Sequence, residues 1–307
     1  MSSPIDLSLL PAPEVLEALD YEQILARRKQ SLLALLPPQE RAAAAQVLAL
    51  ESEPVTKLLE ENAYQELLLR HRINDAARAV MLAFAQRADL DQIGANTNVQ
   101  RLVLVPADPH ASPPVAEVLE PDEAYRLRIQ EAPDALSTAG PREAYEFHAR
   151  SADGRVLDAR AISPAPCEIV VAVLANTPDW HPPAAVLQAV ANALSAEDVR
   201  PLGDEVTITA GQVTEYELQA VLYVGKGPES AIAIKVAEAN AAALSRPLRP
   251  LGYSIYRAAY IAALKVEGVR NVVIRQPAAD ILCGRTQAAR CTRISITAEV
   301  IDEVDRG

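Results

Sequence analysis

A long segment in the first third of the chain has the apolar spacing of one continuous helix. From Pro54, a residue that suits the first turn of a helix, apolar side chains recur every three or four positions to about residue 87. A helix over 54–87 would be about 50 Å long, and a region ending near residue 102 is too small to cover such a stripe. The stripe contains Val55, Leu58, Leu59, Leu67, Leu68, Ile73, Val80 and Phe84.

Two arrangements would bury this stripe. The helix could bend over its own domain, or it could join a helix bundle that another chain completes. Exposed apolar stripes usually mark a partner, so the sequence favours the inter-chain bundle, with those eight residues at the interface. Two shorter helices are predicted before it, one from Pro13 to the Pro37-Pro38 pair that ends it and one over 39–50.

The remainder of the chain predicts small mixed domains. Residues 103–140 are rich in proline and indicate an irregular connector. Beyond Pro141 the apolar period switches between that of helices and that of strands. The predicted helices are 142–151, 184–195, 229–244 and 254–265, and the predicted strands are 156–162, 167–174, 204–209, 216–224, 269–274 and 293–300.

These elements predict an α+β chain with three parts. An N-terminal long-helix bundle region (1–102) is followed by two small α/β sandwich domains (103–212 and 213–307), each with helices on one face of a sheet. An acidic cluster in the connector is predicted to be the solvated N-terminus of a helix, where the helix dipole favours negative charge. Its members are Glu117, Glu120, Asp122 and Glu123.

Charge and composition exclude several classes of protein. The chain has 41 acidic and 29 basic side chains, which argues against binding to nucleic acid. No apolar stretch approaches the roughly 20 residues of a membrane span. The three cysteines are odd in number and irregularly spaced, as is typical of a reducing compartment without a disulfide framework.

The sequence offers no constellation of residues for catalysis, for a metal or for a cofactor. Cys283 and Cys291 are eight positions apart without nearby histidines, so a zinc site is not expected. Segment 225–228 (GKGP) lacks the spacing of a phosphate-binding loop and predicts a tight turn. Asp89 and Asp91 lack the partners of a calcium loop and suggest a helix cap. The histidines lie on separate segments, at His71, His110, His148 and His181.

Several short segments together resemble one protein family. They are 89–94 (DLDQIG), 136–145 (LSTAGPREAY), 163–166 (SPAP), 193–202 (ALSAEDVRPL) and 277–281 (PAADI) with 286–289 (TQAA). In this order, over about 200 residues, they resemble the J-like baseplate proteins of contractile phage tails and R-type pyocins. At residue 167 this chain has cysteine where members of that family often have glycine, so no function is expected of this thiol.

The resemblance implies a structural role as a baseplate wedge component. In that family two copies associate with one smaller chain through N-terminal helices, and C-terminal domains join copies into a ring around the hub. Six wedges surround the tail tube, and their rearrangement releases the sheath. The resemblance also implies assembly in the bacterial cytoplasm, contacts with hub and sheath proteins, and no cofactor. Phage tails and bacteriocins share this part, so both origins stay open.

Two other classes of function stay open. An adaptor or assembly chaperone would use the same N-terminal helices but would be absent from the mature particle. A stand-alone α+β enzyme for a small cationic or neutral metabolite would need a pocket with perturbed acids or bases, for which the sequence offers no candidate.

Overall fold

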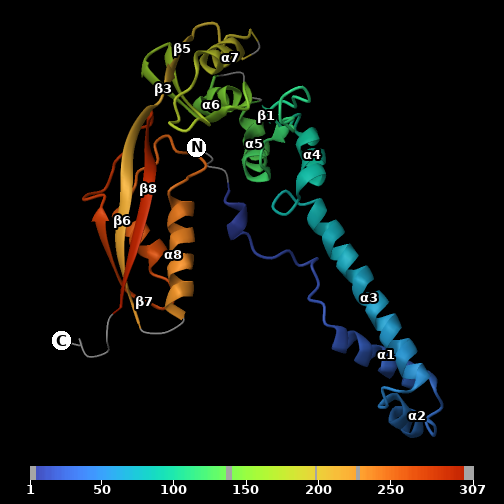
Figure 1. Ribbon diagram of the computed structural model, residues 1–307. Helices are drawn as coiled ribbons and strands as arrows, with labels where there is room; N and C mark the ends of the chain where they lie inside the picture. Colours follow the sequence, from blue (N-terminus) through green and yellow to red (C-terminus); the bar gives the residue numbers. More distant parts are fainter. Residues whose placement is uncertain (1–4, 136–139, 198, 226–228, 301–307) are drawn as a thin grey trace. The chain divides into compact units, whose positions relative to one another are not determined.

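The structure is a computed structural model that describes residues 5–135, 140–197, 199–225 and 229–300. Contacts between Cα atoms divide the chain into two compact units, Met1–Asn98 (unit 1) and Val99–Gly307 (unit 2). The described residues form nine α-helices and eight β-strands. They confirm the predicted α+β class, with helices first and then a two-stranded and two three-stranded sheets (Figure 1). Among these residues, no helix combines the length and apolar character that crossing a bilayer requires.

Unit 1 is helical. It contains the 3-10 turn η1 (Leu7–Leu9) and the helices α1 (Tyr21–Leu35), α2 (Arg41–Leu48), α3 (Pro54–Ala79) and α4 (Arg87–Asn96). α1 begins at Tyr21, later than predicted, because the Asp20 carboxylate accepts hydrogen bonds from the N–H groups of Glu22 and Gln23. α3 begins at Pro54 as predicted.

The predicted length of the long helix is wrong at its C-terminal end. α3 stops at Ala79, and the chain turns over 80–86 before α4 begins. The apolar spacing continues through this turn, but Ala85 and Leu90 are buried instead of continuing a stripe.

α1 packs against α3 through a small buried cluster. Ile24 and Leu25 of α1 contact Ala63 of α3, and Tyr21, Leu59 and Leu67 pack around them. Asn74 of α3 is also buried: its Nδ2 donates to the Glu17 carbonyl (2.9 Å) and its Oδ1 accepts from the Glu17 N–H (3.1 Å). The extended segment before α1 is therefore attached to α3 through its main chain.

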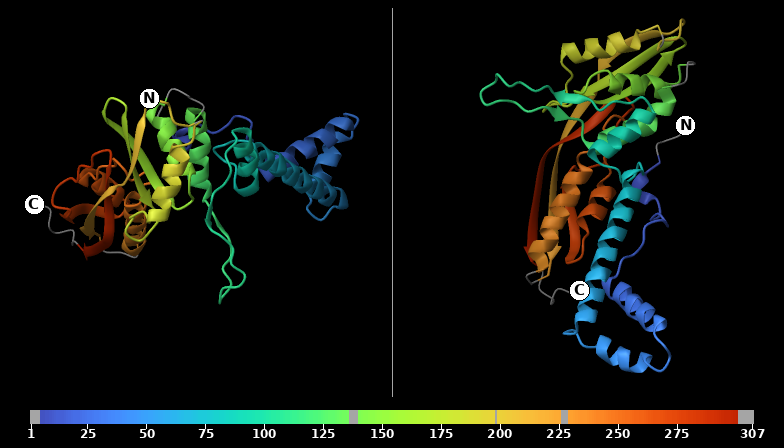
Figure 2. Two further views of the ribbon diagram at one scale, coloured as in Figure 1. Left: turned by 90° about the horizontal axis from the view of Figure 1, so that it is seen from above. Right: turned by 90° about the vertical axis from the view of Figure 1, so that its right-hand side faces the viewer.

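Unit 2 holds the remaining elements. They are β1 (Val103–Val105), β2 (Val118–Leu119), α5 (Asp122–Ala135), α6 (Arg142–Ser151), β3 (Val156–Ala165), β4 (Glu168–Ala175), α7 (Ala184–Leu194), β5 (Glu205–Ala210), β6 (Gln212–Val224), α8 (Glu229–Leu244), α9 (Arg257–Leu264), β7 (Val269–Gln276) and β8 (Gln287–Val300). β1 and β2 form a small antiparallel pair within the predicted connector, and the chain between them projects as an extended loop (Figure 2).

The first sheet has the strand order β3-β4-β5. β4 is antiparallel to β3 and parallel to β5. Tyr145 and Ala149 of α6, with Val190 and Leu194 of α7, pack on Ala159, Ala161, Val171 and Val173 of the sheet. On the opposite face, Ala172 and Leu174 pack with Leu251 and Ala288 from the C-terminal part, so the two sheets share a small core.

The second sheet has the strand order β7-β6-β8, with β6 antiparallel to β7 and parallel to β8. Alternate residues of β6, from Tyr216 to Val224, pack on α8 and α9. The buried Tyr260 hydroxyl of α9 is hydrogen-bonded to the hydroxyls of Tyr216 (2.6 Å) and Ser245 (2.7 Å). Each sheet thus has its own helical layer, although both belong to unit 2, and the predicted boundary at residue 212 stays a prediction.

Cys167 occupies the turn between β3 and β4 instead of the start of a strand. Its φ of 64° lies in the left-handed region, which disfavours every residue with a Cβ by about 1–2 kcal/mol. Substitution Cys167→Gly should therefore raise the free energy of unfolding by about 0.5–1 kcal/mol, once the greater freedom of glycine in the unfolded chain is deducted. Urea unfolding followed by the fluorescence of Trp180 would measure this, and Cys167→Ser, which keeps the strain, should match the original chain.

Candidate interaction surfaces

α3 carries apolar side chains on more of its surface than α1 covers. Figure 1 shows α1 beside only the first half of α3. With 100° of rotation per residue, Val55, Leu58, Leu69 and Ile73 form one flank beside the α1 contact, and Tyr64 and Leu68 lie on the other side. These six side chains, called here the α3 flanks, are between 45% and 62% exposed. Large apolar groups at such exposure along one helix are typical of a contact with a partner.

The structure divides the eight residues predicted for the interface. Val55, Leu58, Leu68 and Ile73 are exposed on α3, whereas Leu59 and Leu67 pack against α1 in the same chain. Val80 and Phe84 are exposed but follow the end of α3. Leu69 and Tyr64, which were not among the eight predicted residues, are also exposed on α3. The inter-chain interface itself stays a prediction.

A buried network of charges joins both sheets of unit 2. Arg150 of α6 donates to Glu131 of α5 (2.8 Å), and Arg249, which follows α8, donates to the same carboxylate (2.9 Å). The buried Asp158 carboxylate of β3 accepts from the Leu251 N–H (3.0 Å), and Glu146 accepts from Arg160 (3.1 Å). The network links residues up to 118 positions apart. Local sequence patterns cannot predict contacts over such a separation.

Burial shifts the titration of this network. It raises the pKa of Asp158 above its usual range, against the opposing effect of the neighbouring Arg249 and Arg150 guanidiniums. Burial and the nearby Arg150 lower the pKa of Arg249 to about 10. Because the groups lie in the interior and compensate one another's charge, their arrangement fixes the geometry between α5, α6, β3 and the chain after α8.

The acidic cluster of the connector is only partly solvated, which corrects the prediction. Glu117 and Glu123 are exposed, and Asp122 and Glu123 lie in the first turn of α5. Glu120 is buried, however, and its carboxylate accepts two hydrogen bonds from Arg128 (2.9 and 2.7 Å) and one from the Leu102 N–H (3.2 Å). It therefore anchors β1 to α5.

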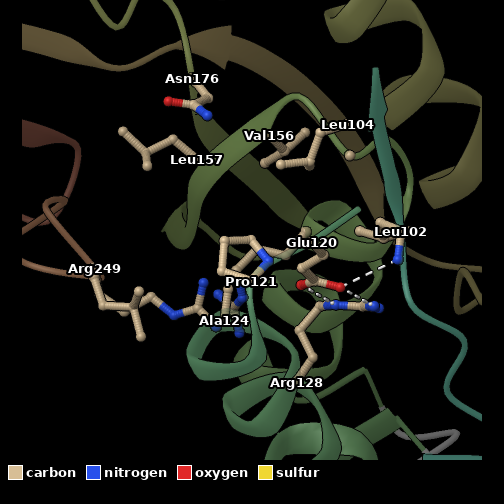
Figure 3. Close-up of a pocket in the computed structure, with 13 residues that line it drawn as sticks. Leu102, Leu104, Glu120, Pro121, Ala124, Arg128, Val156, Leu157, Asn176 and Arg249 are labelled. Carbon is tan, nitrogen blue, oxygen red and sulfur yellow. Dashed lines mark hydrogen bonds and ion pairs between the residues drawn. The ribbon is translucent and has the colours of Figure 1, made fainter. Parts of the chain in front are cut away.

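A cavity of about 170 Å³ lies beside this ion pair. Figure 3 shows Glu120 and Arg128 at one end and Arg249 at another, with Leu102, Leu104 and Leu157 among the walls. Of the charged groups that line it, Glu120 and Arg128 pair with each other, and Arg150 and Arg249 pair with Glu131 outside the lining. The described lining contains no nucleophile. The cavity thus has the character of a packing space beside the charge network.

The cysteines and the two loop-like segments of the sequence form no metal site among the described residues, because no group of His, Cys, Asp and Glu side chains within these ranges has the required arrangement. The cysteines are free thiols, and burial raises the pKa of Cys283. Asp89 lies in the first turn of α4, whose cap is Gln86. Lys226, Gly227 and Pro228 of the predicted turn lie outside the described residues.

Comparison with known proteins finds one family along the chain. The sequence model of the baseplate J-like N-terminal domain matches residues 51–108, which include α3 and α4. The baseplate J-like central domain matches residues 137–210, which include the first sheet. The chain is 48% identical over 303 residues to baseplate protein J of Escherichia phage P2, a match that covers 97% of this chain and 99% of that protein.

Proposed function

Because the chain belongs to the baseplate J-like family, we propose that it is a structural, non-enzymatic component of the baseplate of a contractile tail. More specifically, it acts as a wedge subunit. Two copies associate with one smaller chain through their N-terminal helices, and their C-terminal domains join copies into a ring around the hub. The observation that carries this proposal is the presence of the α3 flanks, which a single chain leaves exposed.

The two sides of α3 suit a bundle of three chains. One face of α3 is covered by α1 of its own chain, and the flanks on either side of that contact are both apolar. A helix with two separate apolar flanks can contact two neighbours at once, as two copies and a third chain would require. Assembly occurs in the bacterial cytoplasm, and the finished protein lies in the tail baseplate.

The interface is tested by Leu58→Asp combined with Leu69→Asp. Both side chains are exposed in the single chain, so unit 1 should stay folded, while two buried carboxylates at the centre of an interface should weaken partner binding about 100-fold or more. Co-purification of the smaller chain measures the effect. Leu202→Asp with Leu282→Asp, the same change at two exposed leucines of unit 2, serves as the matched control. Undiminished co-purification of the α3 variant would contradict the interface.

The wedge assignment is tested in the particle. Tagged chain purified from induced cells should bring tail proteins in fixed ratios, with two copies per smaller partner, and label the end of the tail in negative-stain images. Binding to a partner without presence in the mature particle would instead support an assembly chaperone. A lone monomer that binds no tail protein would overturn the structural role.

A further inference from the structure

The second half of β8 is a regular strand edge. Residues 293–300 pair with 217–224 of β6 in continuous register, because the irregularity in this ladder lies before Arg293. β6 occupies one side of this segment, and in the part of the chain that the structure describes no strand occupies the other (Figure 1). Arg293, Thr297 and Glu299 are exposed on the sheet face opposite the helices.

The two edge strands of this sheet, β7 and β8, differ in how many of their main-chain oxygens accept hydrogen bonds from side chains. At β7 the cationic side chains bind main-chain oxygens: Lys265 donates to the carbonyls of Val269 (2.7 Å) and Arg270, and Arg257 donates to Ile274 (2.9 Å). Among the described residues, the one main-chain oxygen of 293–300 that a side chain reaches is the Arg293 carbonyl, 3.3 Å from the Cys291 thiol. The Thr297 hydroxyl donates to the Ala220 carbonyl of β6 instead (3.5 Å). Natural sheets usually protect exposed edges, so an unprotected edge of eight residues points to a strand partner.

We propose that residues 293–300 of β8 pair antiparallel with the same residues of a second copy, with Ile296 opposite Ile296 on a two-fold axis. This proposal deepens the proposed function, since it specifies how C-terminal domains join copies. The two three-stranded sheets would become one sheet of six strands. The main-chain groups of both edges would then be satisfied by each other.

Charge selects this register. With Ile296 on the axis, Arg293 lies opposite Glu299 at both ends of the pairing, and Ser295 lies opposite Thr297. Moving the axis to Ser295 places Arg293 opposite Thr297, and moving it to Thr297 places Glu299 opposite Ser295. Both shifts leave the charges without opposite partners across the interface.

Apolar side chains support the same register on the other face. Ile294 and Ile296 pair with Leu218 and Ala220 of β6 and pack partly against the core under α8 and α9. In the proposed pairing Ile294 meets Ala298 of the second copy, and the two Ile296 side chains meet each other. The partly covered edge of each core would therefore be closed by the same edge of the other copy.

Cysteine cross-linking of the full chain tests the pairing. In a background that carries Cys167→Ser, Cys283→Ala and Cys291→Ala, since all three native thiols are free, Ile296→Cys should give a covalent dimer with a short bismaleimide. Directly opposite Cβ atoms in an antiparallel pair lie about 5 Å apart. Val273→Cys, on the protected β7 strand, is the matched control and should remain a monomer on denaturing gels. Equal dimer yields from the two positions, or none from Ile296→Cys, would overturn the pairing.

Charge exchange tests the register. Arg293→Glu or Glu299→Arg alone should weaken dimerisation about tenfold, since each creates two like-charge contacts across the axis. Arg293 also lies opposite Glu217 of its own β6, so the single change disturbs its own chain as well. The double variant keeps that disturbance but restores both contacts between copies, so recovered dimerisation supports the register and failure to recover overturns it.

Cross-linking in purified particles separates the two proposals. If the chain is in the particle but Ile296→Cys forms no dimer there, the strand pairing fails and the wedge role stands. If the chain is absent from particles, the wedge role fails, while dimer formation by the purified chain still decides the strand pairing.

Discussion

Substitution Arg150→Leu should lower the free energy of unfolding by about 3–5 kcal/mol, the range expected when one partner of a buried ion pair is removed. The Arg150 side chain is only 5% exposed and donates to Glu131 (2.8 Å) and to the Ala159 carbonyl (3.0 Å). Glu146 and Asp158 also lie within 4 Å of it (3.8 and 3.9 Å). Leucine would fill most of the volume but would leave buried carboxylates without their central cation.

Trp180 provides the measurement. It is the only tryptophan and packs beside the core shared by the two sheets, so its fluorescence during urea unfolding reports on unit 2. The control is Arg155→Leu, whose ion pair with Asp153 (2.7 Å) involves an arginine side chain that is 51% exposed. Its loss should lower the free energy of unfolding by less than about 1 kcal/mol. Equal effects from both variants would show that the buried network does not hold unit 2 together.

The effect of Arg150→Leu should also depend on pH. Burial raises the pKa of Asp158 in the folded chain above its unfolded value, so protonation of this group favours the folded state and its ionisation at higher pH disfavours it. Loss of the Arg150 charge would raise that pKa further. The destabilisation relative to the original chain should therefore be smaller at low pH than at neutral pH.

Substitution Leu222→Ala should have the second large effect, a loss of about 2–5 kcal/mol. Leu222 is fully buried in the central strand of the second sheet, on the face packed by α8 and α9. Truncation removes apolar contacts and leaves a cavity that neighbouring strands, paired on both sides of β6, cannot collapse to fill. The loss should appear as faster amide exchange across β6 and as earlier unfolding in urea.

Leu282→Ala is the matched control for Leu222→Ala. It is the same change at a side chain that is 71% exposed, so its effect should stay within about 0.5 kcal/mol. A similar loss from both substitutions would mean that the second sheet is not organised around β6.

Elements marked by clear periodicity were predictable from the sequence. α8 was predicted with its observed bounds, and β3, β4, β5 and α7 differ from their predicted bounds by three residues or fewer. Alternating apolar residues bounded by prolines and glycines specify these segments locally. β6 begins at Gln212, four residues before its predicted start, because 212–215 are strand residues by pairing with β8 and not by apolar alternation.

Features set by distant contacts were not predictable. The sequence of 54–87 does not predict the end of α3 at Ala79, because the apolar spacing continues beyond that residue. Glu120 looks like its acidic neighbours in sequence, and only the fold brings Arg128 onto it. On α3, periodicity identifies Leu58 and Leu59 as apolar positions, but only the packing of α1 decides that Leu59 faces its own chain.

The hydrogen bonds of Asn74 determine which positions near it can change in related sequences. It binds both main-chain groups of Glu17, and every residue except proline offers the same two groups at that position. The Glu17 side chain adds only a solvent-exposed ion pair with Arg70, of small energetic value. Related chains should therefore vary freely at position 17 while keeping asparagine at position 74. The asparagine side chain binds the main chain at position 17 and does not depend on which side chain that position carries.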